Sequence, residues 1–258
     1  MLSRLISEDQ TWFIPGRYIG DNIRLLYDLI QYLNKENHPG LILNIDFEKA
    51  FDTIDWTFML KVVKAFGFGK CICDWIETFY KNSKATVIIN GQPSKWFEIK
   101  RGCRQGDPIS PYLFVLCAEI LAIMIRENKN INGIFINQYE HKITQFADDT
   151  QSLQQGDRVT FEETIKMLEK FSYVSGLTMN CEKTSAIWVG KERGSKKRYL
   201  PHIKMDWNPS KFKILGIWFT ADLIGCEEIN YTEKFMEVKQ LYKIWSKRIL
   251  TPLGRIAV

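Results

Sequence analysis

The sequence lacks the marks of a secreted, zinc-finger or membrane-spanning protein. Its 258 residues include six cysteines, but no C-x-x-C pair and no Cys/His cluster at zinc spacing. The longest apolar run, residues 112–125, is too short to cross a bilayer and contains Glu119, so we expect a buried helix there. Scattered thiols without a secretory signal sequence predict an intracellular protein with no membrane partner.

No strong excess of one charge runs through most of the chain. The first 190 residues hold 21 Lys/Arg and 23 Asp/Glu, whereas residues 191–258 hold 14 and 7. A basic C-terminal part favours a partner with a polyanionic backbone, although a solvated surface explains the same charge equally well. Because 45% of residues are hydrophobic and 13% aromatic, the chain can bury a core and is not disordered.

Helices and short strands are mixed along the chain. Apolar spacing predicts helices over residues 19–33, 55–66, 71–80, from 112 onward, 159–172 and 231–249. Strands are predicted over residues 41–45, 134–136, 142–146 and 186–189, and those over 134–136 and 142–146 are expected to meet at a turn. A hairpin is predicted over residues 85–99, and a strand or tight hairpin around Gly216 over 211–220. Regular βαβ repeats are missing, so the pattern predicts the α+β class.

Two adjacent aspartates, Asp148 and Asp149, follow the predicted strand that ends at Phe146. Most such pairs are ordinary surface turns, because Asp favours turns through local hydrogen bonds. Here a hairpin tip could project both carboxylates toward one point, where they repel each other without a cation. We expect another polar turn after the pair, and a hard divalent ion such as Mg²⁺ fits this oxygen-rich site.

A third carboxylate, Asp46, directly follows the predicted strand 41–45. It could instead cap a helix, but Asp52 or Asp55 is better placed to cap the next helix. Asp46 is then a carboxylate at a strand end, where sheet-based sites collect ligands. Three such carboxylates can hold two divalent cations about 3.5–4 Å apart, which stabilise an in-line phosphoryl displacement.

A glycine-rich basic loop over residues 101–111 precedes the apolar helix. Glycine lets the backbone approach a ligand closely, and a helix N-terminus favours anions. The loop could therefore seat a nucleotide or a template. The same residues could equally form a plain loop that begins a core helix.

These segments, in this order, resemble the conserved blocks of reverse transcriptases, most closely those of non-LTR, LINE-type retrotransposons. Blocks A, B and C are matched by residues 43–52 (LNIDFEKAFD), 101–111 (RGCRQGDPISP) and 146–149 (FADD). The segment before block A, block D and block E are matched by residues 13–17 (FIPGR), 175–183 (SGLTMNCEK) and 215–217 (LGI). Trp12 departs from the glycine usual in the family. The resemblance covers essentially the whole chain.

The resemblance implies the palm of a right-hand polymerase, an antiparallel sheet with packed helices. Residues 1–220 would form the palm with partial fingers, and residues 221–258 the start of a thumb. It implies an RNA-directed DNA polymerase that uses an RNA template, a DNA primer and dNTPs. The first fingers blocks and an endonuclease would precede Ser3, so we expect the middle of a longer protein.

The resemblance also implies a role for individual residues. Metal ligands would be Asp46, Phe47, Asp148 and Asp149, binding two Mg²⁺ or Mn²⁺ ions, with the three aspartates catalytic. Nucleotide contacts would be Phe51 as a steric gate against the 2′-hydroxyl, Gln105, Gly106 and Lys183. Template and primer contacts would be Arg17, Arg101, Arg104, Leu215 and Gly216. Without the resemblance, Phe51 is better interpreted as core and Lys183 as solvated.

Two alternatives to an active LINE-type enzyme stay open. One is a truncated, non-catalytic nucleic-acid-binding remnant of such an element, although the intact aspartate triad speaks against chemical decay. The other is a group II intron-type maturase, which shares the palm blocks.

Overall fold

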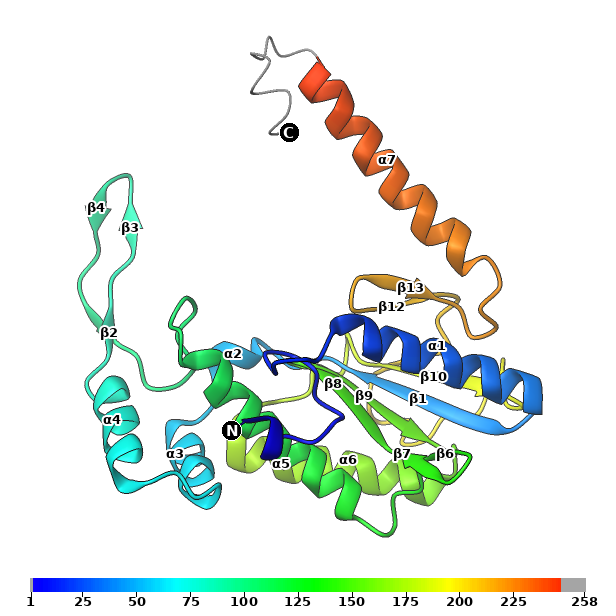
Figure 1. Ribbon diagram of the computed structural model, residues 1–258, viewed down its shortest axis with the longest axis horizontal. Helices are drawn as coiled ribbons and strands as arrows, with labels where there is room; N and C mark the ends of the chain where they lie inside the picture. The colour runs from blue at the N-terminus through cyan, green and yellow to red at the C-terminus, as the bar shows by residue number, and fades with distance from the viewer. Residues whose placement is uncertain (1, 247–258) are drawn as a thin grey trace.

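A five-stranded sheet forms the centre of the computed structural model, which describes residues 2–246 (Figure 1). Its strands are β1 (Pro39–Ile45), β8 (Ile143–Phe146), β9 (Asp149–Gln154), β10 (Ser185–Gly190) and β11 (Asp206–Trp207). They lie in the order β11-β10-β1-β9-β8, and only the β10–β11 pair is parallel. In the central strand, Ile42 pairs with Ile187 on one side and with Leu153 on the other.

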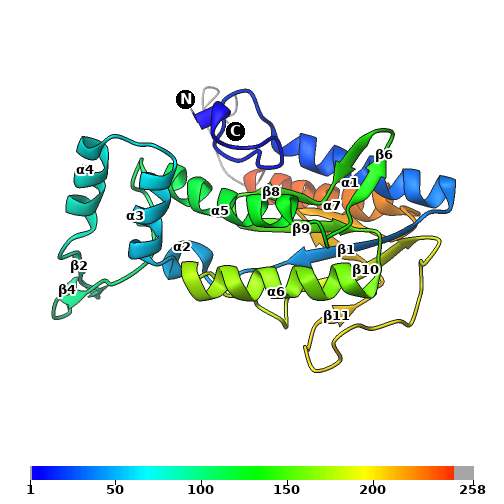
Figure 2. The same cartoon turned by 90° about the horizontal axis from the view of Figure 1, so that it is seen from below.

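Helices cover both faces of this sheet. The helices of residues 2–246 are η1 (Leu2–Arg4), α1 (Ile19–Glu36), α2 (Ala50–Thr53), α3 (Trp56–Ala65), α4 (Lys70–Tyr80), α5 (Ser110–Glu127), α6 (Arg158–Ser175) and α7 (Cys226–Ser246), of which α4 and α7 lie away from the sheet (Figure 1). Figure 2 shows α5 and α6 lying along one face, where they pack on each other, while α1 lies on the opposite face. No helix in the described range 2–246 is both long and apolar enough to cross a membrane.

The two faces of β1 enter two separate cores. Ile42 packs with Leu26 of α1 on one face, whereas Leu43 packs on the other face in a core with Phe114 of α5 and Phe161 of α6. A strand buried on both faces has a continuous apolar sequence, which explains the run of residues 41–45. The mixed helices and mainly antiparallel sheet confirm the predicted α+β class.

Within residues 2–246, four two-stranded antiparallel ladders lie outside the main sheet. They are β2–β5 (Lys84–Ala85, Phe97–Glu98), β3–β4 (Ile88–Ile89, Gln92–Pro93), β6–β7 (Ile134–Ile136, Tyr139–His141) and β12–β13 (Phe212–Ile214, Ile217–Phe219). The hairpin predicted over residues 85–99 is therefore confirmed, and of the strand or tight hairpin predicted over 211–220 the structure has the hairpin. The first forms an extended ribbon beyond α4, and α7 rises away from β12–β13 (Figure 1).

The predicted helices are present with small shifts at their ends, and Asp55 caps α3 by accepting a hydrogen bond from the Phe58 amide at 2.9 Å. Two strand predictions are wrong. The polar turn expected after Asp149 is strand β9, and strand 134–136 pairs with residues 139–141 rather than with 142–146. Residues 247–249 of the last predicted helix, and residues 247–258 of the expected thumb, lie outside the described residues.

The composition of β9 explains why a turn was expected there. Most of the six residues of β9 are polar, yet all of them but Asp149 are buried. Side-chain partners bond the NH₂ groups of its two glutamines: Gln151 donates to Asn44 at 3.1 Å, and Gln154 donates to Thr164 at 3.0 Å. Within residues 2–246, the side-chain oxygens of these two glutamines are buried without a hydrogen-bond partner. The partners of the NH₂ groups come from distant segments, so local polarity indicated a turn instead.

Candidate active site

The adjacent aspartates lie at the tip of the β8–β9 hairpin. Phe146 pairs with Asp149, which leaves Ala147 and Asp148 as the two turn residues. Ala147 has a φ of 58°, while Asp148 does not have a positive φ. Positive φ at the first turn residue alone is the pattern of a type II′ turn, where glycine is usual. The expected hairpin tip is therefore present, with alanine in a demanding position.

Asp46 leaves the central strand beside this tip. Because Ile45 pairs with Thr150, Asp46 comes next to the start of β9. The Asp46 amide donates to Thr184 Oγ1 at 3.3 Å, and its carbonyl accepts from the Asn180 amide at 2.8 Å. The predicted position of Asp46 at a strand end is confirmed.

The three carboxylates influence one another electrostatically. Desolvation by surrounding protein, followed by the charges of Asp148 and Asp46, raises the pKa of Asp149 to about 6, although this side chain keeps an exposed surface. Burial likewise raises the pKa of Asp148, with Asp46 acting in the same direction and a backbone hydrogen bond opposing it. Three mutually repelling carboxylates fit a hard divalent cation, which would relieve the repulsion.

The carboxylates are neighbours without being a preformed cage. Among residues 2–246, no three acidic, histidine or cysteine side chains already lie close enough together to ligate one metal ion. Binding would therefore require the side chains to turn toward a shared ion. The predicted metal-ligand role of the aspartates stays a prediction.

Residues 178–184 form the other border of this site. An isolated antiparallel bridge joins Phe47 to Met179, and its hydrogen bonds are made by Asp46 and Glu48. The Phe47 carbonyl consequently faces away from that segment. Lys183 is exposed and lies in the turn that begins at Asn180, so the predicted phosphate-binding lysine is near Asp46 in the fold.

An apolar pocket of about 580 Å³ brings together three of the predicted nucleotide contacts, Phe51, Gln105 and Gly106. Its lining is Trp12, Phe13, Phe51, Arg104, Gln105, Gly106, Asp107, Pro108, Ser110, Pro111 and Tyr112. Phe51 stacks on Phe114, with ring centroids 4.1 Å apart, and meets the edge of Trp12 at 5.5 Å. Packing on two sides fixes the Phe51 ring at the pocket wall.

Trp12, Phe13 and Tyr112 are pocket residues that sequence reasoning did not assign. Phe13 and Tyr112 meet edge to face at 5.5 Å, although they are far apart in the chain. Trp12 was noted only as a departure from the resemblance. Two adjacent aromatics shortly before a Pro-Gly pair were the available sign of an exposed aromatic wall.

The basic loop is built on the end of α2. The Gly102 amide donates to Ile54 at 2.8 Å, and the Cys103 amide donates to Phe51 at 2.6 Å. Gly102 has a φ of 91°, and a Cβ there would lie 2.7 Å from the Asp52 carbonyl oxygen. Only glycine permits this close approach.

The two arginines of the loop both line a second pocket, of about 470 Å³. Arg104 also lies over the Tyr80 ring at 5.2 Å and donates to Ser83 Oγ at 3.3 Å. Arg101 is exposed. Both positions are compatible with phosphate contacts, which stay predictions.

The remaining template and primer candidates lie elsewhere. Arg17 donates to the carbonyls of Ile6, Ser7 and Gln10, so its guanidinium holds the N-terminal segment, and a template contact by Arg17 stays a prediction. Leu215 and Gly216 form the β12–β13 turn, with φ values of 50° and 83°. This turn lies on the α1 side of the sheet, and its predicted primer contact also stays a prediction.

Comparison with known proteins identifies the sequence family. The family model described as "Reverse transcriptase (RNA-dependent DNA polymerase)" matches residues 1–219. The "Transposon TX1 uncharacterized 149 kDa protein" of Xenopus laevis is 28% identical over 259 residues, covering 99% of this chain and 18% of that protein. The "Retrovirus-related Pol polyprotein from type-2 retrotransposable element R2DM" of Drosophila melanogaster is 25% identical over 224 residues, covering 82% of this chain and 20% of that protein.

The chain thus spans about a fifth of the length of these relatives. Among solved structures, apo telomerase from Candida tropicalis, truncated from its C-terminal domain, matches with a TM-score of 0.58 and 13% identity. The match covers 83% of this chain and 40% of that one. This likeness shows the fold and confirms the predicted palm.

Proposed function

Since the chain belongs to the reverse transcriptase (RNA-dependent DNA polymerase) family, with relatives in non-LTR retrotransposons, we propose that it adds dNTPs to a primer 3′-hydroxyl on an RNA template. One observation carries this proposal. Asp46 and the Asp148–Asp149 turn leave adjacent strands of the sheet, and a pocket beside them unites Phe51 with the block-B loop. Such a reaction takes place where RNA and dNTPs are available, inside the cell.

Members of this family generally depend on divalent metal ions. We propose that Asp46, Asp148, Asp149 and the Phe47 carbonyl hold two Mg²⁺ ions, which Mn²⁺ can replace. When bound, the ions would lower the pKa of the attacking hydroxyl and offset charge on the departing pyrophosphate. The raised pKa of Asp149 supports this assignment: desolvation and then the charges of Asp148 and Asp46 disfavour its charged form, and a bound cation would favour that form.

The chain's own residues would mainly position the reactants. Gln105 and Gly106 would pack on the incoming nucleotide, and Phe51 would fill the space that a 2′-hydroxyl needs. Lys183, in the turn bonded to Asp46, would approach the triphosphate and donate a proton to the pyrophosphate. Holding reactants in line is the largest protein contribution in phosphoryl transfer.

Contacts along the nucleic acid would extend from this centre. Arg17, Arg101 and Arg104 would meet the template, and the Leu215–Gly216 turn would hold the primer end. We assign residues 1–220 to the palm with partial fingers and residues 221–258 to the start of a thumb. Exposed lysines along α7 would follow the phosphate backbone of the duplex.

Primer extension on an RNA template with Mg²⁺ tests the proposal, using both this chain and a version extended by its flanking sequence. We expect Asp46→Ala and Asp148→Ala each to lower turnover by about 10²-fold or more, as when one preorganised electrostatic group is lost. Asp74→Ala, on the exposed side of α4, is the matched control and should retain turnover.

A near-normal rate in Asp46→Ala or Asp148→Ala would contradict the assigned role. If neither wild-type version extends a primer, but both bind RNA with an affinity that falls steeply with salt, the non-catalytic remnant is the correct interpretation.

A further inference from the structure

A buried glutamine outside the predicted site touches the aspartate turn. The Gln10 side chain is fully buried, with 0% of its surface exposed. Its Nε2 donates to the Ala147 carbonyl at 3.3 Å, and its Oε1 accepts from the Ala147 amide at 3.1 Å. Both backbone polar groups of the residue before Asp148 are thus bonded to one carboxamide.

Ala147 is the turn residue that most needs such support. It occupies the left-handed region, with a φ of 58°, at the position of a type II′ turn where glycine is usual. An L-residue with a Cβ is unfavourable there unless its surroundings hold it. Two hydrogen bonds from Gln10, in a site without solvent, supply that restraint.

The same carboxamide reaches the wall of the apolar pocket. Gln10 Oε1 also accepts from the Trp12 amide at 3.0 Å, and Trp12 lines the pocket against Phe51. One side chain therefore joins the backbone of the pocket wall to the backbone of the aspartate turn. Their relative position depends on it.

Gln10 is itself held by backbone pairing with β8. The Gln145 amide donates to the Asp9 carbonyl at 2.7 Å, and the Thr11 amide donates to the Gln145 carbonyl at 3.1 Å. These bonds form a short parallel bridge between Gln10 and Gln145 at the edge of the sheet. The buried Asn22 of α1 donates to the same Gln145 carbonyl at 3.0 Å.

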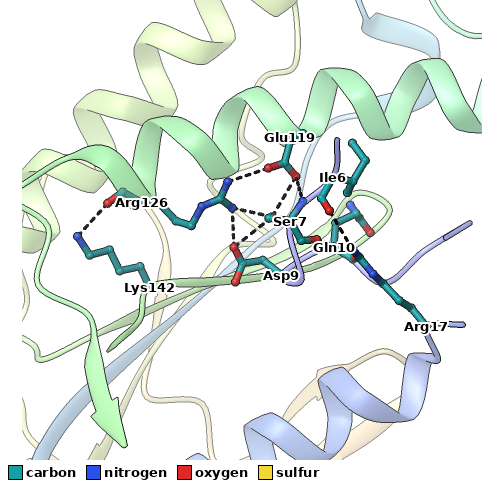
Figure 3. Close-up of polar contacts among 8 residues, drawn as sticks. All are labelled: Ile6, Ser7, Asp9, Gln10, Arg17, Glu119, Arg126 and Lys142. Atoms are coloured by element: carbon teal, nitrogen blue, oxygen red, sulfur yellow. Dashed lines mark hydrogen bonds and ion pairs between the residues drawn. The ribbon is translucent and has the colours of Figure 1, made fainter. Parts of the chain in front are cut away.

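Charged side chains anchor this segment to α5 (Figure 3). Arg126 donates to Asp9 at 2.5 Å and to Glu119 at 2.7 Å. Glu119, only 1% exposed, also accepts from the amide and hydroxyl of Ser7 at 3.2 and 3.1 Å. Arg17 also holds this segment, by donating to the Gln10 carbonyl at 2.5 Å. The segment is a rigid base for Gln10.

We propose that Gln10 is a positioning residue, which fixes the Asp148–Asp149 turn for metal binding and aligns it with the pocket wall at Trp12. The inference rests on the proposed polymerase function. It predicts that losing the Gln10 carboxamide impairs the metal site before it impairs the fold.

The test replaces Gln10 by Met, which has similar volume and no strong hydrogen-bonding groups. Mn²⁺ affinity is measured by electron paramagnetic resonance, and kcat and KM for dNTP by primer extension. We expect Mn²⁺ affinity and kcat each to fall about 10- to 100-fold, as on loss of a residue supporting metal ligands, with a smaller change in KM. Gln10→Glu keeps an acceptor for the Ala147 and Trp12 amides, so its Mn²⁺ affinity and kcat should lie between those of Gln10→Met and wild type.

The matched control is Gln154→Met. Gln154 is also fully buried and donates to two hydroxyls, but it lies at the far end of β9. The substitution Gln154→Met should leave Mn²⁺ affinity unchanged. Adding Ala147→Gly to Gln10→Met should restore part of the affinity, because glycine adopts a positive φ without support.

Wild-type Mn²⁺ affinity in folded Gln10→Met or Gln10→Glu would overturn the proposal, as would an equal loss in Gln154→Met. If the wild-type chain binds Mn²⁺ but neither it nor its extended version extends a primer, the polymerase function is overturned, while weaker Mn²⁺ binding by Gln10→Met still supports the positioning role. A wild-type chain that binds no Mn²⁺ overturns both.

Discussion

Replacing Asp149 by asparagine should stabilise the fold when no divalent cation is present. Desolvation by the surrounding protein, followed by the charges of the two neighbouring aspartates, raises the pKa of Asp149 from 3.8 to about 6. At 1.36 kcal/mol for each pKa unit, this shift corresponds to about 3 kcal/mol for a group without solvent contact. Because Asp149 is exposed, screening by water reduces the expected gain to about 1 kcal/mol.

The pH dependence of this gain has a definite sign. A folded-state pKa above the unfolded value means that the folded chain binds more protons, so wild-type stability falls as pH rises from about 4 to about 6. Above about pH 6, wild type has lost all of the stability that the protonated Asp149 side chain contributes. The asparagine side chain of the variant carries no charge, so the difference in unfolding free energy between Asp149→Asn and wild type should grow from pH 5 to pH 7.5.

Thermal unfolding in EDTA, followed by circular dichroism, measures the effect. A gain of about 1 kcal/mol raises Tm by roughly 2–4 °C in a chain of this size. Mg²⁺ should then stabilise wild type more than Asp149→Asn, because the variant lacks one ligand charge. Glu77→Gln, at an exposed site on α4, controls for net charge. An advantage that is absent at pH 7.5, or equal at both pH values, would refute the electrostatic reasoning.

Two other substitutions test the pocket and the loop. Phe51→Val should admit ribonucleotides in primer extension, because the ring held by Phe114 and Trp12 is replaced by a smaller side chain; unchanged selection between rNTP and dNTP would count against the steric gate. Gly102→Ala should lower the free energy of unfolding by about 1–3 kcal/mol in guanidinium titrations, since its Cβ would meet the Asp52 carbonyl. Gly67→Ala, which has a similar φ of 80° but open space, should cost less, and equal losses would contradict the proposed clash.

Local sequence patterns predicted much of the fold. The 3.6-residue spacing located helices such as α1 and α6, and the apolar run of residues 41–45 located the central strand. The order of the aspartate-bearing segments predicted that Asp46 would lie near the Asp148–Asp149 turn. The helices and the strand depend on neighbours within a few residues, which a sequence displays directly, whereas the expectation for Asp46 and the distant aspartate pair agrees with the resemblance to blocks A and C.

Features built from distant segments could not be predicted in this way. In the buried polar strand β9, the NH₂ groups of Gln151 and Gln154 donate to Asn44 and Thr164. The pocket wall depends on Phe13 meeting Tyr112 across the fold. Periodicity carries no information on such partners, since each contact forms only after the sheet and α5 have assembled.

The central place of β1 has a consequence for how the molecule loses its geometry. The strands that carry Asp46 and Asp149 at their ends, β1 and β9, each have a hydrogen-bonded neighbour on both sides. Fraying at an outer strand leaves the spacing of these carboxylates intact, and separating them requires the ladders of the innermost strands to break. Such opening belongs to the most cooperative part of a fold. The spacing of Asp46 and Asp149 should therefore persist until the whole domain melts, whereas Asp148, in the turn to the outer strand β8, also depends on the Gln10 contacts.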